Sequence, residues 1–349
     1  MPATIKDVAR RARVAVGTVS RVVNGRPDVN RELRDRVLRV LDELNYRPNA
    51  RAQSFARNSS PVVSFILSNR DFLHPFHSHI LQGVEEYCEE TGHFVMYTRF
   101  RYSADLKPAQ IRLPGVLQRH GIADSVILAG TNYDNFVNVL EKRGIEYVLL
   151  ANNFVSPRRR DPVNQVRFDD FSGALEATRY LVQLGHKHIW YVGDTNMPWY
   201  QRRCEAYEQV MNEAGLKARA QTLALSDDRF MNGFNSIKML LDQKAPVTAI
   251  FAGTDDVAYG AAEALRVSGY QVPRDVSVIG FDDQYGSQRV PAMTTVRVEA
   301  EEVGRELAKM AISKIRNKEH RFAEVVVPTR LVKRETCRPL LAGEKRGQA

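Results

Sequence analysis

The sequence is 349 residues long, with 44% hydrophobic and 26% charged residues, which is ordinary for a soluble globular protein. A chain of this length is too long for one ordinary core and predicts two or three domains. Cys88, Cys204 and Cys337 share no close spacing, so the sequence predicts neither a disulfide framework nor a metal site. The first residues lack a signal-peptide core and no apolar run approaches membrane-spanning length, so we expect a cytoplasmic protein. We expect no cofactor.

Positive charge is concentrated at the N-terminus. Residues 1–60 contain 13 Lys and Arg against 6 Asp and Glu, whereas the remainder has 37 against 35. A basic segment on a nearly neutral body is typical of a protein with a polyanionic partner. A solvated basic tail would carry the same charge, but apolar residues recur in this segment at helical spacing, which argues against disorder.

The basic segment predicts three short helices. The first has an apolar stripe at i, i+3, i+4 and i+7 from Ile5, and Thr4 with Asp7 predicts a capping box at its start. After a tight turn a second helix is predicted over 16–24, and after a Pro-containing turn a third over 31–45. Two short helices joined by a tight turn are the helix-turn-helix pattern, in which the second helix enters the major groove. Other three-helix domains share this apolar pattern, but the basic outer surface favours nucleic acid.

The stretches DVARRARVAVGTVSRVVNG and ELNYRPNARAQSFAR resemble the headpiece and hinge of the lactose-repressor (LacI/GalR) family of bacterial transcription regulators. The resemblance implies a helix-turn-helix DNA-binding domain over 1–47 and a hinge helix with linker over 48–60. The DNA-binding residues it implies fall into three groups: Val16, Gly17 and Arg21 at base edges; Thr18, Ser20 and Asn24 at phosphates or in helix packing; and Thr4, Tyr46, Asn49, Arg51 and Phe55 in further contacts.

Four residues depart from the family's pattern. Arg13 stands where a residue with positive φ is common, and Ala15 lacks the hydroxyl that could cap the second helix, a loss of ~1 kcal/mol in typical capping series. Gly17 offers a base edge only backbone and close approach. Phe55 stands where Leu usually enters the minor groove from a hinge that folds on DNA; an aromatic wedge can unstack a base step, although Phe55 could instead pack on the larger domain.

From residue 61 onward apolar strands alternate with amphipathic segments, several of which end in Gly before the next strand. The predicted strands form two series, at 62–67, 94–97, 125–129 and 147–150 and then at 189–192, 222–225, 249–252 and 277–280. Such alternation predicts parallel sheets with helices on both faces. The two series imply two similar α/β lobes, which bind ligands at the carboxyl ends of their strands.

The stretches HPFHSHILQGVEEYCEETGH and GTDDVAYGAAEALRVSGYQVPRDVSVIGFDD extend the resemblance, which implies a two-lobed periplasmic-binding-protein-like fold. Its implied effector-binding and dimerisation domain covers 61–337, with lobe 1 over about 61–164 and 296–320 and lobe 2 over about 165–294 and 322–337. The chain would cross between lobes near 162–166, 293–297 and 319–323, and a last helix over 299–318 would return to lobe 1. The basic residues from Lys333 onward, and 338–349 in particular, are expected to form a flexible tail.

Polar or aromatic residues at strand ends are the candidate effector ligands. Asp282 can accept hydrogen bonds from hydroxyls, and Arg203, which matches the family's Arg-x-x-Gly-aromatic pattern except at Gly, can donate to a hydroxyl or carboxylate. Asp282 could instead cap a turn, and Arg203 could form a surface ion pair. Phe76 is expected to flank the cleft mouth. Weaker candidates are Asp169, Thr254 (where the family usually has Asn), Asn69, Phe72 and Phe230.

The resemblance implies a transcriptional regulator, a repressor, that binds a pseudo-palindromic operator as a homodimer and responds to a sugar or sugar derivative. A purine or other non-sugar co-repressor is the alternative effector. The sequence has no GxGxxG after a strand, Walker loop, HExxH or nucleophile elbow, so an α/β sugar- or nucleotide-metabolising enzyme is a remote alternative. A secreted solute-binding protein of the same body fold is disfavoured by the basic headpiece.

Overall fold

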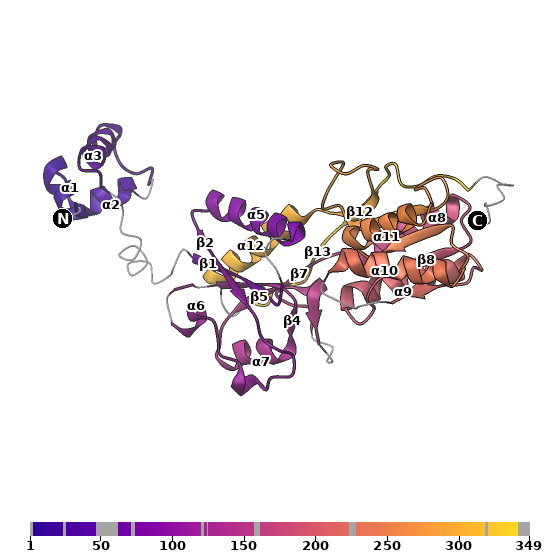
Figure 1. Ribbon diagram of the computed structural model, residues 1–349. Coiled ribbons are helices and arrows are strands. Elements are labelled where there is room, and N and C mark those ends of the chain that lie inside the picture. Colours follow the sequence, from indigo (N-terminus) through magenta and orange to yellow (C-terminus); the bar gives the residue numbers. More distant parts are fainter. Residues whose placement is uncertain are drawn as a thin grey trace. The chain divides into compact units, whose positions relative to one another are not determined.

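The computed structural model describes residues 3–23, 26–46, 62–70, 74–119, 122–123, 125–156, 161–222, 228–317 and 320–340. The chain divides into two compact units, Met1–Ser60 and Pro61–Ala349 (Figure 1).

The N-terminal unit contains three helices, α1 (Ile5–Ala12), α2 (Val16–Val23) and α3 (Arg31–Glu43), as the apolar spacing predicts. Their inner faces enclose one small core, formed by Val8, Ala9, Ala12, Val19, Val22, Val37 and Val40. The predicted capping box at the start of α1 is confirmed, because Asp7 N donates to Thr4 Oγ1 and Thr4 N donates to Asp7 Oδ2 at 3.0 Å.

Arg13 ends α1 in the left-handed conformation, with φ of 51°. Its N–H donates to the carbonyls of Ala9 and Arg10, which satisfies acceptors that the end of a helix leaves open. The expectation of a positive φ at this position is confirmed. A residue with a Cβ raises the free energy of this conformation by roughly 1–2 kcal/mol relative to Gly.

Lobe 1 is built on a six-stranded parallel sheet of order β13-β7-β5-β3-β1-β2. Its strands are β1 (Val62–Ser68), β2 (Phe94–Phe100), β3 (Ser125–Gly130), β5 (Tyr147–Leu150), β7 (Gln165–Phe168) and β13 (Val325–Val327). Helices α5 (Pro75–Glu90) and α12 (Ala300–Arg316) pack together on one face. The other face carries α7 (Asp134–Lys142), and the smaller elements are η1 (Pro108–Gln110), α6 (Gly115–Gln118), β4 (Asn132–Tyr133), η2 (Ala151–Asn153) and β6 (Phe154–Val155).

Lobe 2 repeats the design with a sheet of order β14-β12-β11-β10-β8-β9, in which only β14 runs antiparallel to its neighbour. Its strands are β8 (Ile189–Val192), β9 (Ala220–Gln221), β10 (Ala249–Ala252), β11 (Ser277–Asp282), β12 (Thr294–Val298) and β14 (Thr329–Val332). Helices α8 (Asp170–Gln183) and α9 (Pro198–Glu213) pack on one face, and α10 (Arg229–Asp242) and α11 (Asp255–Val267) on the other. The strand expected at 222–225 falls mostly on residues 223–225, which lie outside the described chain, and the described strand next to it is β9.

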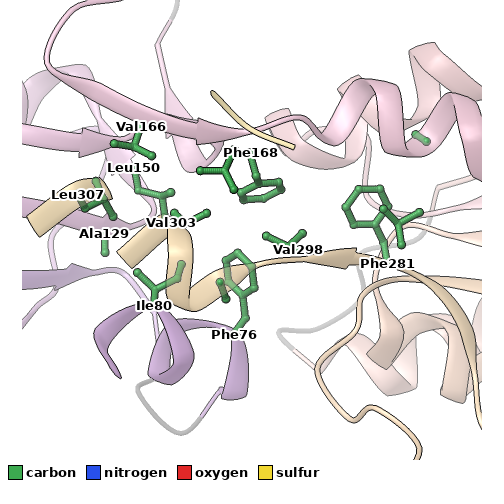
Figure 2. Close-up of a cluster of buried hydrophobic side chains, with 14 of the residues drawn as sticks. Phe76, Ile80, Ala129, Leu150, Val166, Phe168, Phe281, Val298, Val303 and Leu307 are labelled. Carbon is green, nitrogen blue, oxygen red and sulfur yellow. The ribbon is translucent and has the colours of Figure 1, made fainter. Parts of the chain in front are cut away.

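One apolar core runs through both lobes (Figure 2). Phe76 of lobe 1 packs edge to face on Phe168, with ring centroids 5.6 Å apart. Val298 and Phe281 continue this core into lobe 2. The lobes are therefore joined at their base by packed side chains as well as by the chain itself.

The chain crosses between the lobes three times, and each crossing lies C-terminal to the expected range. Pairing with β13 extends β7 in lobe 1 as far as Phe168, and pairing with β14 extends β12 in lobe 2 as far as Val298. The third crossing is at Pro328, between β13 and β14. The expected crossings at 162–166, 293–297 and 319–323, and the lobe limits drawn from them, are corrected accordingly, because ladder hydrogen bonds carry each strand past them.

The expectation of a flexible tail from Lys333 is wrong as far as Leu340. Thr336 is fully buried, and its Oγ1 donates to Val278 O at 2.6 Å and accepts from Thr294 N at 2.8 Å. Leu340 N donates to Leu184 O at 2.8 Å. The basic composition of this segment gave no sign of these contacts in the sequence. Residues 341–349 lie outside the described chain. In the described parts of the chain, no helix is long and apolar enough to cross a bilayer.

Candidate functional site

The outer face of α2 is open to solvent, as helical spacing requires once Val19 and Val22 are buried. Val16 is 42% exposed, and a Cβ added at Gly17 would meet no atom within 4 Å. Arg21 is also exposed, with its Nε 3.8 Å from Asp28 Oδ2 in a solvent-screened ion pair that holds it only weakly. The face therefore presents an apolar side chain, a position without a side chain and an exposed guanidinium.

The other predicted DNA-binding residues are placed less uniformly. Thr18 and Ser20 are half-buried on α2, and Thr4 serves as the cap of α1. Tyr46 packs against the small core of the N-terminal unit. The remaining ones lie outside the described residues, namely Asn24, Asn49, Arg51 and Phe55.

A cavity of about 580 Å³ lies between the lobes of the larger unit. Lobe 1 contributes residues from the carboxyl ends of β1 and β2, and lobe 2 contributes the first turns of α10 and α11. The lining residues are Asn69, Arg70, His74, Arg101, Asp228, Arg229, Phe230 and Asp256. Its position follows the rule that ligands bind outside the carboxyl ends of parallel strands, and its volume suits a small organic molecule.

Polar contacts cross this cavity. His74 Nε2 lies 3.1 Å from Asp256 Oδ2, and Arg229 Nη1 lies 2.7 Å from the same ring nitrogen. Tyr285 donates its hydroxyl to Asp256 Oδ1 at 2.5 Å. Burial by itself would raise the pKa of Asp256, but the hydrogen bonds from His74 and Tyr285 and the nearby charges outweigh it and lower the pKa. Asp256 is therefore an ionised residue that links the lobes.

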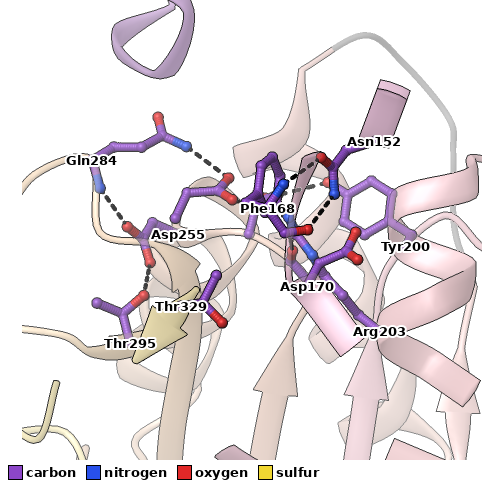
Figure 3. Close-up of polar contacts among 12 residues, drawn as sticks. Asn152, Phe168, Asp170, Tyr200, Arg203, Asp255, Gln284, Thr295 and Thr329 are labelled. Carbon is purple, nitrogen blue, oxygen red and sulfur yellow. Dashed lines mark hydrogen bonds and ion pairs between the residues drawn. The ribbon is translucent and has the colours of Figure 1, made fainter. Parts of the chain in front are cut away.

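Behind the cavity, Arg203 and Asp282 form an ion pair, with Arg203 Nη2 3.1 Å from Asp282 Oδ1. Both side chains are almost fully buried, and Arg203 also donates to the carbonyl of Gly253. The guanidinium stacks on Phe281, with Cζ 3.6 Å from the ring centroid (Figure 3 shows Arg203 beside Phe168 and Tyr200). We expected both residues to bind the effector, but in the structure they bond to each other and neither is among the residues that line the cavity.

Two more carboxylates near the end of β11 are held by internal contacts. Asp255 accepts from Gln284 N at 2.8 Å and from Thr295 Oγ1 at 2.6 Å (Figure 3), and burial raises its pKa. Asp283 pairs with Arg297 and Arg334. Asp282 itself has φ of 104° and Asp283 has φ of 56°, conformations that L-residues rarely adopt. This network fixes the end of β11 and offers no free acid–base pair.

Three other candidate effector ligands, Phe76, Asp169 and Thr254, do not line the cavity either. Phe76 lies in the core, 6% exposed, because it packs on Phe168 instead of flanking the cleft mouth as expected. Asp169 caps α8 by accepting from Ser172 N at 3.2 Å. Thr254 is buried and its Oγ1 lies 3.2 Å from the Tyr200 hydroxyl.

Sequence reasoning missed most of the cavity lining, although Asn69 and Phe230 were among the weaker candidates. Phe72, the third of these, lies outside the described residues. The signal was present, because Arg70 lies two residues after β1, Arg101 directly follows β2 and His74 directly precedes α5. Positions after strands and before helices are where α/β folds place ligand contacts.

Two family models match the chain in the places that the fold suggests. Residues 4–49 match the model described as bacterial regulatory proteins of the lacI family, and residues 178–337 match the model of the periplasmic binding protein-like domain.

Whole-chain relatives agree with these matches. The chain is 29% identical to the HTH-type transcriptional regulator DegA of Bacillus subtilis (strain 168), over 97% of this chain and 99% of the relative. It is also 29% identical to the HTH-type transcriptional repressor CytR of Escherichia coli (strain K12), over 97% of each.

Solved structures are similar over nearly the whole chain. The lac repressor dimer bound to operator and the anti-inducer ONPF is 25% identical, with a TM-score of 0.77 over 96% of this chain and 99% of that one. The complex of the transcriptional regulator CelR with cellobiose is 28% identical, with a TM-score of 0.69 over the same shares. The chain therefore joins a helix-turn-helix domain of the lacI family of bacterial regulatory proteins to a periplasmic-binding-protein-like body, and its whole-chain relatives are transcriptional regulators.

Proposed function

We propose that this regulator represses transcription in the cytoplasm by binding a pseudo-palindromic operator as a homodimer, and that a sugar or sugar derivative bound between the lobes controls it. The observation that carries the proposal is the coexistence of an exposed helix face on α2 and a cavity between two lobes. Two related structures support it, since one is described as a dimer on its operator and the other as a complex with cellobiose.

The DNA contacts in this proposal follow from the chemistry of the α2 face. Arg21 would form a bidentate contact with a guanine, which discriminates between bases by about 1–3 kcal/mol. Val16 would meet a thymine methyl, and Gly17 would allow close approach of the backbone. Thr18, Ser20 and Asn24 would position the helix on phosphates.

The domain limits are part of the same proposal. Residues 1–47 would bind the major groove. The hinge and linker at 48–60 would bring Asn49 and Arg51 to the DNA backbone and Phe55 to the minor groove. A hinge helix of this length is too short to be stable alone, so its folding on DNA would couple operator binding to the state of the body.

Control by the effector rests on the cavity between the lobes. A ligand that contacts both lobes favours a closed body only to the extent that it binds that state more tightly. Closure would change the separation of two hinges in a dimer and hence the fit to two half-sites. The cross-lobe contact between His74 and Asp256 is the protein's own contribution to closure.

Operator selection tests the proposal. The full-length protein would be used to select duplexes from a randomised pool, and anisotropy titrations would then compare variants on the selected sequence. We expect a two-fold symmetric site, affinity that falls steeply with salt, and a loss of at least ten-fold for Arg21→Ala. Arg39→Ala, a solvent-exposed arginine on α3, is the matched control. Equal affinity of Arg21→Ala and the wild type would overturn the DNA assignment.

A further inference from the structure

We infer that the ligand of the interlobe cavity carries a negative charge: it is a sugar derivative with a carboxylate or phosphoryl group, held by Arg101 of lobe 1 and Arg229 of lobe 2. The inference rests on the proposed function, because it takes this cavity as the effector site. It departs from recognition by Asp282 and Arg203, whose charges already compensate each other in the interior.

The cavity lining has an excess of positive charge. Arg70, Arg101 and Arg229 face it together with His74, against two carboxylates, Asp228 and Asp256. Guanidinium groups bind carboxylate and phosphate oxygens in pairs of parallel hydrogen bonds, so they suit an anionic group better than a neutral hydroxyl. Phe230 supplies an apolar surface in the same cavity for the rest of the ligand.

Both carboxylates of the lining are engaged by the protein. Asp256 accepts from Tyr285 and contacts His74. Asp228 caps α10, with its Oδ1 accepting from Met231 N at 3.1 Å. They are therefore less available to a ligand than the guanidinium groups opposite them.

The two arginines of the proposal have open donors. Arg101 forms no ion pair or hydrogen bond with any residue that the structure describes, although it lines the cavity. Within the described chain, the side-chain partner of Arg229 is His74, through Nη1. The rest of its guanidinium has N–H groups for a further acceptor.

The contact between Arg229 and His74 cannot satisfy both partners of the imidazole ring at once. His74 Nε2 faces a guanidinium donor at 2.7 Å and the Asp256 carboxylate at 3.1 Å, and Nδ1 of the same ring is buried without a partner in the described residues. If Nε2 accepts from Arg229 it cannot donate to Asp256, and if it donates to Asp256 it opposes the guanidinium. An anion that drew Arg229 away would leave His74 free to donate to Asp256.

Helix termini add to the positive potential. The cavity is lined by the N-cap residues of α5 and α10, His74 and Asp228, and by Asp256 in the first turn of α11. Neither α5 nor α11 has a hydrogen bond from a side-chain cap. Open N–H groups and helix dipoles at such ends favour anions.

The same charges link the ligand to closure. Closing the cavity brings arginines of the two lobes toward each other, which like-charge repulsion opposes. An anion between them reverses the sign of that interaction, so a charged ligand favours the closed state where its neutral parent sugar does not.

The test compares each neutral sugar with its charged derivatives by calorimetric titration of the full-length protein. The pairs are D-glucose with D-glucuronate and D-glucose 6-phosphate, D-galactose with D-galacturonate, and D-ribose with D-ribose 5-phosphate. We expect a charged member to bind at least ten-fold more tightly than its parent, and the two acids and the phosphates distinguish a carboxylate site from a phosphoryl site. Arg101→Gln and Arg229→Gln should each weaken this binding ten-fold or more, whereas Arg179→Gln, at a surface ion pair far along α8, should not.

Three outcomes would overturn the inference: a neutral sugar that binds as tightly as its charged derivatives, unchanged affinity in both cavity variants, or no binding by any compound of the panel. Operator titrations with the same ligands separate this failure from that of the proposed function. A neutral sugar that binds and alters operator affinity leaves the proposed function intact. A charged sugar that binds through Arg101 and Arg229 without altering operator affinity supports the inference and contradicts effector control.

Discussion

Arg203 and Asp282 form a buried ion pair that connects α9 to the end of β11, with 2% and 7% of their side chains exposed. Asp282 holds a left-handed backbone conformation there, and Gln284 Nε2 donates to its other carboxylate oxygen at 3.1 Å. The pair holds the end of β11 against α9 within lobe 2.

Breaking this pair should destabilise the protein strongly. Arg203→Leu leaves the Asp282 carboxylate buried without its counter-ion, which typically lowers the free energy of unfolding by about 3–5 kcal/mol. Arg179→Leu, at a half-exposed ion pair with Glu213, should lower it by less than about 1 kcal/mol. Urea unfolding of both variants measures the difference. Adding Asp282→Asn to Arg203→Leu should recover part of the loss; a double variant less stable than either single one would contradict the pairing.

The contact between Asp256 and His74 should depend on pH in one direction. Because the pKa of Asp256 is lowered in the folded state, its contribution to stability is present above the ordinary carboxyl pKa of about 4 and is lost as pH falls through the folded value. Asp256→Asn should therefore unfold at a lower temperature than the wild type at neutral pH. The two unfolding temperatures should converge below pH 4. A difference that stayed constant down to pH 3 would show that ionisation of Asp256 is irrelevant.

Close packing of α5 on α12 should make Gly304 intolerant of a side chain. A Cβ at Gly304 would overlap the carbonyl of Ile80 on α5, so Gly304→Ala must separate the two helices. Such overpacking costs typically about 1–3 kcal/mol. Gly115→Ala is the control, since a Cβ there meets no atom within 4 Å. Thermal unfolding of the two variants should differ clearly, and equal stability would show that the helices separate without cost.

Gly17 should behave in the opposite way. Its added Cβ meets no atom within 4 Å, so Gly17→Ala should raise the stability of α2 by up to about 1 kcal/mol through helix propensity. If the backbone of Gly17 approaches the bases, the same substitution should nevertheless weaken operator binding. Hydrogen exchange of the α2 amides and anisotropy titration measure the two effects. Unchanged affinity for the operator would remove Gly17 from the DNA interface.

Most of the fold could be predicted from local sequence patterns. The three headpiece helices, the capping box at Thr4 and Asp7, and the alternation of strands and helices all follow from spacing along the chain. The lobe crossings were less predictable, because the ends of β7, β12 and β13 depend on pairing with strands distant in sequence. The fixed position of Thr336 was equally hard to predict, because its hydrogen-bond partners Val278 and Thr294 are distant in sequence.

The cavity was harder to predict than the fold. Arg203 and Asp282 were predicted as effector ligands, because a sequence does not reveal that two opposite charges neutralise each other in the interior. Arg101 and Arg229 are far apart in the chain, and only the folded lobes bring them to one cavity. Their shared role required a geometry that no local pattern encodes.

The three crossings have a consequence for biosynthesis. Lobe 1 is discontinuous, because α12 covers its sheet and β13 forms its outer strand, and both follow all of lobe 2 in sequence except β14 and the segment after it. A ribosome therefore completes the N-terminal helices long before lobe 1 can close its core. The helix-turn-helix unit is therefore complete in sequence before the two-lobed body, whose two sheets are whole only once β13 and β14 have been added.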